Sequence, residues 1–168
     1  MRYVPIMRFL LILFVIPLAG FGQQSPFGSQ TIRDNAHANE VMTQLVANSP
    51  ARGAAAPNLK LALSNGAGEI ALADLWKEKP LVLIFGSLTC DVSCEFSKEI
   101  LAVYQKFRDR ANFAYIYIRE AHPKDGWIVA PKYSVIDDPK TSAERSAAAG
   151  RFAALTRYPF PILVDTIE

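Results

Sequence analysis

The sequence has no repeat, no long stretch of low complexity and no apolar run of the length of a membrane span. Its main apolar stretch, Phe9 to Phe21, has about 13 residues, whereas a helix needs roughly 20 to cross a bilayer. Of the 168 residues, 51% are hydrophobic and 20% are charged. This composition is that of a globular protein, and the length suits one domain of ordinary size.

The chain also lacks an excess of charge of either sign. It has 18 Lys and Arg against 16 Asp and Glu, and two of the basic residues, Arg2 and Arg8, precede the apolar stretch. Without residues 1–22 the two counts are equal. The sequence therefore gives no indication of a nucleic-acid surface, and we expect no nucleic-acid partner.

The first 22 residues have the order of a signal peptide: positive charge, apolar stretch, then small residues. We expect residues 1–22 to direct export to the periplasm or the extracellular space or, if they are not cleaved, to anchor the protein in a membrane. No cysteine lies near this junction, which argues against a lipid-anchored lipoprotein. Residues 23–56 are predicted to hold a helix over Asp34 to Val46, with Asp34 as its N-cap, followed by a linker.

From Pro57 onward, alternating strand and helix patterns predict an α/β domain over residues 57–168. The expected elements are a hairpin over 59–71, a short helix over 72–77, a buried strand over 81–85, a helix over 93–107, a buried strand over 112–118, a helix over 140–156 and a strand over 162–165. On the helix over 93–107, the apolar residues Phe96, Ile100, Val103, Tyr104 and Phe107 share one face, which should pack on a sheet. These elements predict a right-handed βαβ unit and a central, mostly parallel sheet flanked by helices.

Cys90 and Cys94 are the only cysteines, and they lie one helical turn apart directly after the strand over 81–85. At a strand-to-helix junction, free N–H groups and the positive end of the helix stabilise a thiolate. In an oxidising compartment the pair could be a structural disulfide. That bridge would close a loop of about four residues and add little stability, which favours reactivity over a structural role.

Three blocks then occur in order: Phe-Gly-Ser-Leu-Thr-Cys at 85–90, Tyr-Ile-Arg-Glu-Ala-His-Pro-Lys-Asp-Gly-Trp at 117–127 and Pro-Ile-Leu-Val-Asp-Thr at 161–166. From about Pro57 to Thr166 the chain resembles the iodothyronine deiodinase family. The resemblance implies a thioredoxin-like fold and an enzyme of the thyroxine deiodinase class. Cys90 would be the nucleophile, at the position of the family's selenocysteine, and Glu120 and His122 would lie beside it.

The resemblance also implies that the fold continues past Glu168, so that the domain over 57–168 is incomplete and the strand over 162–164 has an exposed edge. Related proteins suggest a homodimer. Pro161 and Trp127 are expected to support the substrate or the thiolate, with Trp127 also anchoring the loop that carries His122.

The roles of the polar residues can be argued from chemistry. A histidine beside the thiol would polarise it or pass a proton to the leaving group, and Glu120 would fix the tautomer of His122. The alternative for His122 is a solvent-facing loop residue. Ser87 and Thr89 should cap the helix or hydrogen-bond the thiolate, with capping the favoured role. Cys94 would resolve a sulfenic acid or mixed disulfide formed on Cys90.

Three departures from the family pattern affect the choice of substrate. A thiol replaces the more acidic selenol, so reductive deiodination should be slower. Leu88 stands where the family often has a cysteine, and Pro139 replaces a histidine associated with gripping the iodothyronine. A general peroxide or disulfide reductase therefore fits as well as a deiodinase.

The first hypothesis is thus a thiol oxidoreductase acting on a small molecule, with no cofactor or metal but with an external reductant such as a dithiol protein. A second is a thioredoxin-fold copper chaperone that binds Cu(I) through Cys90 and Cys94. Against it, Asp91 stands where that family has a proline. A third is an inactive relative that keeps only the fold.

Overall fold

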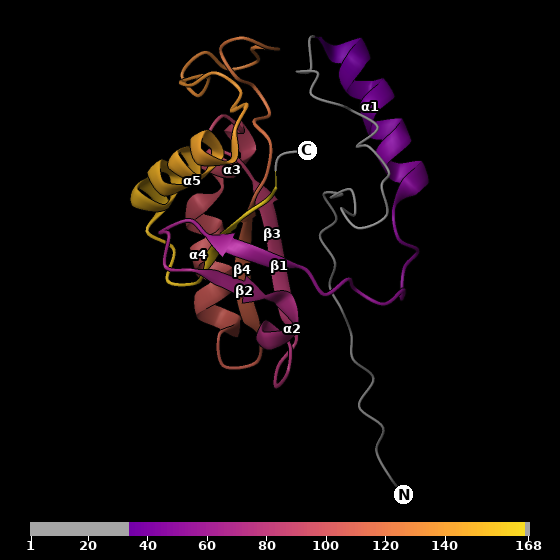
Figure 1. Ribbon diagram of the computed structural model, residues 1–168, viewed down its shortest axis with the longest axis vertical. Coiled ribbons are helices and arrows are strands. Elements are labelled where there is room, and N and C mark those ends of the chain that lie inside the picture. Colours follow the sequence, from indigo (N-terminus) through magenta and orange to yellow (C-terminus); the bar gives the residue numbers. More distant parts are fainter. Residues whose placement is uncertain (1–33, 167–168) are drawn as a thin grey trace, which may run out of the picture.

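The structure, a computed structural model, describes residues 34–166 (Figure 1). The predicted signal peptide or anchor over 1–22 lies outside these residues. The elements are α1 (Asn35–Asn48), β1 (Lys60–Leu63), β2 (Glu69–Ala71), α2 (Leu72–Leu75), β3 (Leu81–Gly86), α3 (Asp91–Glu95), α4 (Ser97–Phe107), β4 (Asn112–Tyr117), α5 (Ser142–Thr156) and β5 (Ile162–Val164). The predicted N-cap of α1 is confirmed, because the Asp34 carboxylate accepts a bond from the His37 N–H at 2.8 Å.

Five strands form one sheet in the order β2-β1-β5-β4-β3. β3, β4 and β5 run parallel, whereas β1 is antiparallel to both β2 and β5. The tight β1–β2 turn uses Gly66 and Gly68, both with positive φ. The α/β class and the N-terminal hairpin are confirmed. The sheet was predicted to be mostly parallel and is instead mixed, because two of its four pairings are antiparallel.

The parallel strands carry the two crossover helices on the same face of the sheet (Figure 1). From β3 to β5 the chain advances in one direction across the sheet, and right-handed crossovers then place α4 and α5 together. Their apolar residues pack on Phe113, Tyr115 and Tyr117 of β4. The opposite face packs Ala114 and Ile116 against the hairpin and α2. Both faces therefore hold β4 rigidly and fix its carboxyl end.

The strand over 162–164 was predicted to have an exposed edge, and this is wrong. β5 lies between β1 and β4, because β1 returns antiparallel to it. Among the described residues, β2 and β3 are the edge strands. β3 is accordingly only partly buried over its four middle residues, and not a fully buried strand as predicted.

The helix predicted over 93–107 is two helices, α3 and α4, separated at Phe96. Phe96 has ψ of 14°, far from the helical value, and this changes the direction of the chain. Phe96 and Val103 are consequently exposed, contrary to the predicted apolar face. Ile100, Tyr104 and Phe107 do pack on the core.

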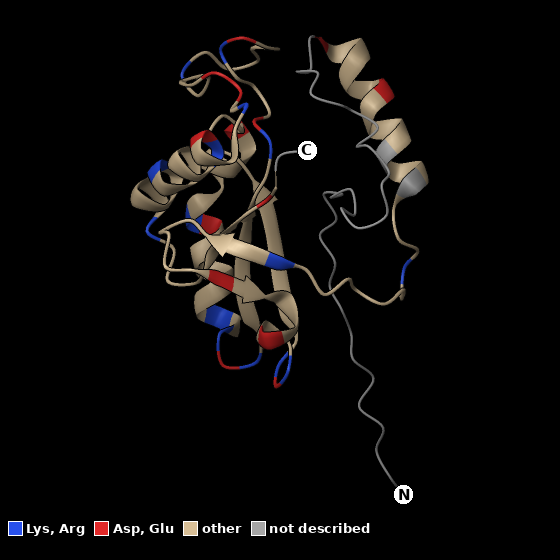
Figure 2. Cartoon of the chain, in the orientation of Figure 1, with Lys and Arg blue, Asp and Glu red and all other residues tan. Residues whose placement is uncertain are grey.

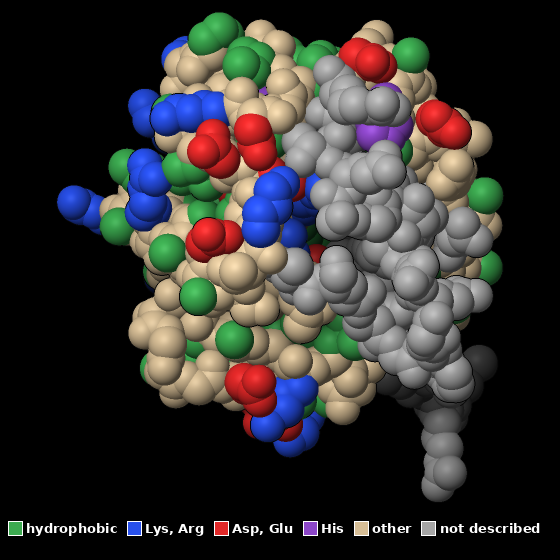
Figure 3. Space-filling view, turned by 45° about the horizontal axis from the view of Figure 1, so that its top comes forward, with side chains coloured by type: hydrophobic (Ala, Val, Ile, Leu, Met, Phe, Trp, Pro, Cys, Tyr) green, Lys and Arg blue, Asp and Glu red, His purple; other side chains and the backbone are tan. Residues whose placement is uncertain are grey.

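The surface carries charges of both signs close together. Figure 2 shows acidic and basic residues side by side in the loops at both ends of the sheet, and the face in Figure 3 has no broad patch of one sign. Such a surface does not favour a polyanionic partner. No helix over residues 34–166 has the length and apolar character that a membrane crossing requires.

Gly86, the last residue of β3, has no room for a side chain. A Cβ built there would collide with the hydroxyl oxygens of Ser93 and Tyr115, both of which belong to buried side chains. We expect Gly86→Ala to lower the free energy of unfolding by about 1–3 kcal/mol, measured by urea denaturation. The matched control is Gly150→Ala in α5, where the nearest atom lies 3.6 Å away and where a helical alanine should stabilise. Equal effects of the two substitutions would contradict this packing.

Candidate active site

The cysteines lie at the carboxyl edge of the parallel strands, directly after β3. The turn is closed by a bond from the Cys90 N–H to the Ser87 carbonyl at 3.3 Å, and the Cys94 N–H donates to the Cys90 carbonyl at 3.1 Å. Both residues are free, partly buried thiols. Cys90 therefore lies directly before the short helix α3 and Cys94 lies within it, one turn apart as predicted.

The N-terminus of α3 differs from the prediction. Cys90 itself occupies the N-cap position without a side-chain cap bond, so neither Ser87 nor Thr89 is the cap. The Asp91 carboxylate accepts the free Val92 N–H at 2.8 Å. A five-residue helix whose first N–H groups are partly occupied by a carboxylate stabilises a thiolate less than a long helix would.

The hydroxyls of Ser87 and Thr89 instead join the cysteine turn to the loop after β4. The Ala121 N–H donates to Ser87 Oγ at 3.2 Å, and the His122 N–H donates to Thr89 Oγ1 at 3.1 Å. Both hydroxyl residues are almost completely buried. They thus place the backbone of His122 beside the residue that precedes Cys90.

Glu120 is a buried carboxylate that holds the same turn. Its Oε2 accepts from the Thr89 N–H at 2.9 Å and from the Thr89 hydroxyl at 2.7 Å. Its Oε1 accepts from the Tyr117 hydroxyl, which itself accepts the Leu88 N–H at 3.1 Å. Burial raises the pKa of Glu120, and the bonds from Thr89 and Tyr117 oppose that shift. The sequence did not identify Tyr117 as a site residue, because its place in the apolar run over 112–118 indicates only a buried strand.

His122 is oriented by Trp127, whereas the sequence analysis predicted Glu120 in this role. His122 Nδ1 lies 3.0 Å from the Trp127 carbonyl oxygen. A carbonyl can only accept, so Nδ1 carries the hydrogen and Nε2 keeps a lone pair. The Trp127 ring packs edge-on against the imidazole, with centroids 5.0 Å apart. The imidazole is thus a partly buried base held by one loop.

The Cys94 thiol is partly buried and hydrogen-bonded. Its Sγ donates to the Leu88 carbonyl at 3.4 Å. Burial raises the pKa of Cys94 to about 11, and the negative charges of a Cys90 thiolate and of Glu120 add to the shift. Cys94 is therefore protonated at neutral pH, as suits a second, resolving thiol.

The raised pKa of Cys94 predicts slow alkylation. A Cys90→Ser variant loses the charge of Cys90 but keeps the burial that is the largest cause of the shift, so Cys94 should react with iodoacetamide at neutral pH at least roughly tenfold more slowly than a free cysteine. Its rate should continue to rise above the pH at which the rate of a free cysteine levels off. Alkylation is followed by mass spectrometry, with the same variant in denaturant as the control. A native rate equal to the denatured rate would contradict the assignment.

Pro161 does not lie at this site. Its carbonyl accepts the Tyr115 N–H at 2.8 Å at the amino end of β5, whereas the cysteine turn follows the carboxyl end of β3. The expectation that Pro161 supports the substrate or thiolate therefore finds no support in the register of the strands.

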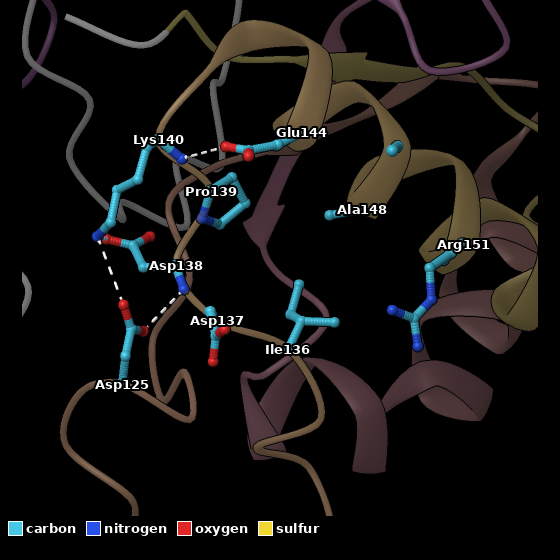
Figure 4. A pocket seen from close by; sticks show the side chains of 10 residues that line it. Asp125, Ile136, Asp137, Asp138, Pro139, Lys140, Glu144, Ala148 and Arg151 are labelled. Atoms are coloured by element: carbon cyan, nitrogen blue, oxygen red, sulfur yellow. Dashed lines mark hydrogen bonds and ion pairs between the residues drawn. The ribbon is translucent and has the colours of Figure 1, made fainter.

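A hollow of about 480 Å³ lies between α5 and the segment before it (Figure 4). Asp138 is buried on one side of it and pairs with Arg119 at 2.9 Å and with Lys140 at 3.4 Å. Asp125 accepts the Asp138 N–H at 2.8 Å, which joins the loop after β4 to the segment before α5. Pro139 lines this hollow, at the position where the family resemblance implies a histidine that grips the iodothyronine.

Part of the chain is similar in sequence to known proteins. Thyroxine 5-deiodinase of Sparus aurata is 31% identical over 99 residues, 55% of this chain and 37% of that protein. The Homo sapiens protein of that name is 32% identical over 98 residues, 58% of this chain and 32% of its own length. The chain thus spans about a third of these relatives.

Two solved structures have a similar arrangement at low identity. An uncharacterized conserved protein from Geobacillus kaustophilus has a TM-score of 0.48 and 18% identity, covering 67% of this chain and 51% of that one. A thiol-disulfide oxidoreductase from Bacteroides fragilis has a TM-score of 0.42 and 16% identity, covering 67% and 66%. The family model described as Iodothyronine deiodinase matches residues 31–168. The protein belongs to the iodothyronine deiodinase family.

Proposed function

We propose that this protein is a thiol-dependent oxidoreductase in which Cys90 attacks the substrate and Cys94 resolves the product. The substrate is an iodinated aromatic compound or, as an equally suited class, a peroxide or small disulfide. An external dithiol, such as a dithiol protein, returns the pair to the reduced state. The reaction needs no bound cofactor, and export or membrane anchoring by residues 1–22 would bring the protein to its substrate.

With an iodinated phenol, the Cys90 thiolate attacks iodine, so that an S–I bond forms and the C–I bond breaks. The aromatic carbon takes a proton, and His122 Nε2 is suited to deliver the one that it accepts from the Cys90 thiol when the thiolate forms. Cys94 then attacks the Cys90 sulfur and iodide leaves, while the Cys94 proton passes to solvent. The resulting disulfide accepts two electrons from the external dithiol, and these are the electrons that replaced iodine by hydrogen.

With a peroxide, the same thiolate attacks one oxygen and the O–O bond breaks. The leaving alkoxide takes a proton and departs as an alcohol, while Cys90 becomes a sulfenic acid. Cys94 displaces its hydroxyl as water and forms the disulfide. Both sequences use the same three groups, Cys90, His122 and Cys94.

The observation that carries the proposal is the pair of bonds that the Thr89 hydroxyl makes, one as donor and one as acceptor. One bond holds Glu120 and the other holds the His122 backbone, so the turn with Cys90 and the loop with the base are fixed to each other. The raised pKa of Cys94 supports its place as the second thiol, since Cys94 is held protonated at neutral pH. The copper alternative would have to use Cys90 and Cys94 alone, because over residues 34–166 no three or more His, Cys, Asp or Glu side chains form a group that could hold a metal ion.

The test is turnover by the purified protein with dithiothreitol and three substrates in parallel: hydrogen peroxide, a small aromatic disulfide and an iodinated phenol. Iodide release, peroxide loss and thiol release are the readouts. We expect thiol-dependent turnover of at least one of them, with iodide release the slowest if the missing imidazole at Pro139 weakens binding. No turnover of any, together with stoichiometric Cu(I) binding to the reduced protein, would overturn the proposal in favour of the metal chaperone.

A further inference from the structure

The two cysteines are held one helical turn apart, and this geometry does not fit a disulfide between them. The Cys94 N–H donates to the Cys90 carbonyl at 3.1 Å, and the Cys94 thiol donates to the Leu88 carbonyl at 3.4 Å. Residues four apart along a helix have Cβ atoms about 5–6 Å apart, whereas a disulfide needs about 3.5–4.5 Å. A bridge between Cys90 and Cys94 therefore requires the backbone of α3 to unwind.

The helix α3 is short and weakly held, so it can unwind while the rest of the fold stays in place. It has five residues, and the break at Phe96 separates it from α4. Val92 and Phe96 are 57% and 54% exposed, so its outer side buries little apolar surface. Its one buried residue is Ser93, whose hydroxyl lies with that of Tyr115 beside Gly86. A segment with few buried contacts opens locally at a low cost in free energy.

The carboxyl end of α3 is joined to the loop after β4. Glu95 Oε1 accepts from Lys132 Nζ at 3.1 Å and from the Tyr133 hydroxyl at 3.2 Å. The Lys132 ammonium also lies over the Tyr133 ring, 4.5 Å from its centroid, so the two side chains contact Glu95 together. This loop lies at the same end of the sheet as α3 (Figure 1), and in it the Trp127 carbonyl holds His122. A displacement of Glu95 therefore changes the loop that orients the imidazole.

We propose that α3 is a redox switch, which is wound in the dithiol protein and unwinds when the Cys90–Cys94 bridge closes. This rests on the proposed function, in which Cys94 loses its proton to solvent and attacks Cys90. The S–S bond forms, and the bond from the Cys90 sulfur to its leaving group breaks. Unwinding displaces Glu95 and releases Lys132 and Tyr133, which opens the bridge to the external dithiol. That dithiol gives two electrons and two protons to the bridge as its own disulfide forms, and α3 winds again.

The test compares amide hydrogen exchange in the full protein before and after one equivalent of dithiobis(nitrobenzoate). This aromatic disulfide forms a mixed disulfide with Cys90 and releases one coloured thiolate, and closure of the bridge by Cys94 releases a second. In the bridged protein we expect the N–H groups of Cys94 and Phe96, which bond within α3, to exchange at least roughly tenfold faster. Those of Tyr133 and Ser134, which bond to a carbonyl of the loop, should also exchange faster. Those of β4 should not change.

Two variants isolate the bridge and the contact with Glu95. Cys94→Ser forms the mixed disulfide on Cys90 and cannot close the bridge, so its exchange should match that of the reduced protein. Tyr133→Phe removes one bond to Glu95 without changing a charge, and it should make the second release of thiolate roughly two- to fivefold faster. The matched control is Tyr104→Phe on α4, which should leave both releases unchanged.

Unchanged exchange of α3 in the bridged protein, or the same acceleration in Cys94→Ser, would overturn the switch. An unchanged second release in Tyr133→Phe would also overturn it, because loss of the Glu95 contact would then be no part of the step. Failure of the wild-type protein to release the second thiolate would instead overturn the proposed function, since Cys94 would not resolve the adduct on Cys90.

Discussion

Cys90→Ser should abolish thiol-dependent turnover of every substrate, with a loss of on the order of 1,000-fold or more. A serine hydroxyl is far less acidic than a thiol, and it cannot form the sulfenic acid or mixed disulfide that Cys94 would resolve. Cys94→Ser should behave differently. It should complete one turnover at a normal rate and then stop, because the Cys90 sulfenic acid or mixed disulfide has no partner thiol to displace the leaving group.

The distinction is measured by single-turnover kinetics and by the mass of the protein after one equivalent of substrate. In Cys94→Ser we expect an adduct on Cys90, and in the wild-type protein an internal disulfide with the loss of two hydrogens. A large excess of small thiol should restore part of the Cys94→Ser activity by replacing the resolving thiol. Full activity in Cys90→Ser, or an adduct on Cys94 in the wild-type protein, would show that the nucleophile is assigned wrongly.

The sequence was sufficient where a local pattern determines the outcome. The apolar run over 112–118 was predicted to be a buried strand and forms β4, and Asp34 was predicted from its residue type to be the N-cap of α1. The position of β5 could not be predicted in this way. Its place between β1 and β4 depends on the return of β1 from the far end of the chain, and nothing within 162–164 encodes that pairing.

The partners of the site residues were harder to predict than the residues themselves. Glu120 and His122 are two positions apart, so a direct bond between them was a reasonable expectation. In the structure they face different partners: Glu120 contacts Thr89 and Tyr117, and His122 contacts the backbone of Trp127. Backbone carbonyls carry no sequence signal, and for that reason the group that fixes the imidazole could not be found from residue types alone.

Glu120→Ala should be the most disruptive substitution outside the cysteines. It removes the acceptor for the Thr89 N–H, the Thr89 hydroxyl and the Tyr117 hydroxyl, and all three donors lie in buried surroundings. Leaving such groups unpaired and opening a cavity should lower the free energy of unfolding by roughly 3–5 kcal/mol. Activity should fall with it, since the turn that carries Cys90 keeps only the bonds of Ser87, Leu88 and Thr89 to β4 and the loop after it. Urea denaturation and the turnover assay measure the two effects.

Glu120→Gln separates the charge of this residue from its shape. Burial raises the pKa of Glu120, so the folded protein keeps its proton to higher pH than the unfolded chain does. The contribution of this group to stability is therefore complete below the unfolded pKa of about 4.5 and is lost as pH rises through the folded value. Because glutamine does not titrate, the wild-type protein should lose stability relative to Glu120→Gln as pH rises from 4.5. A relative gain of wild-type stability over that range would mean that the bonds from Thr89 and Tyr117 outweigh burial, and that Glu120 is held as an anion.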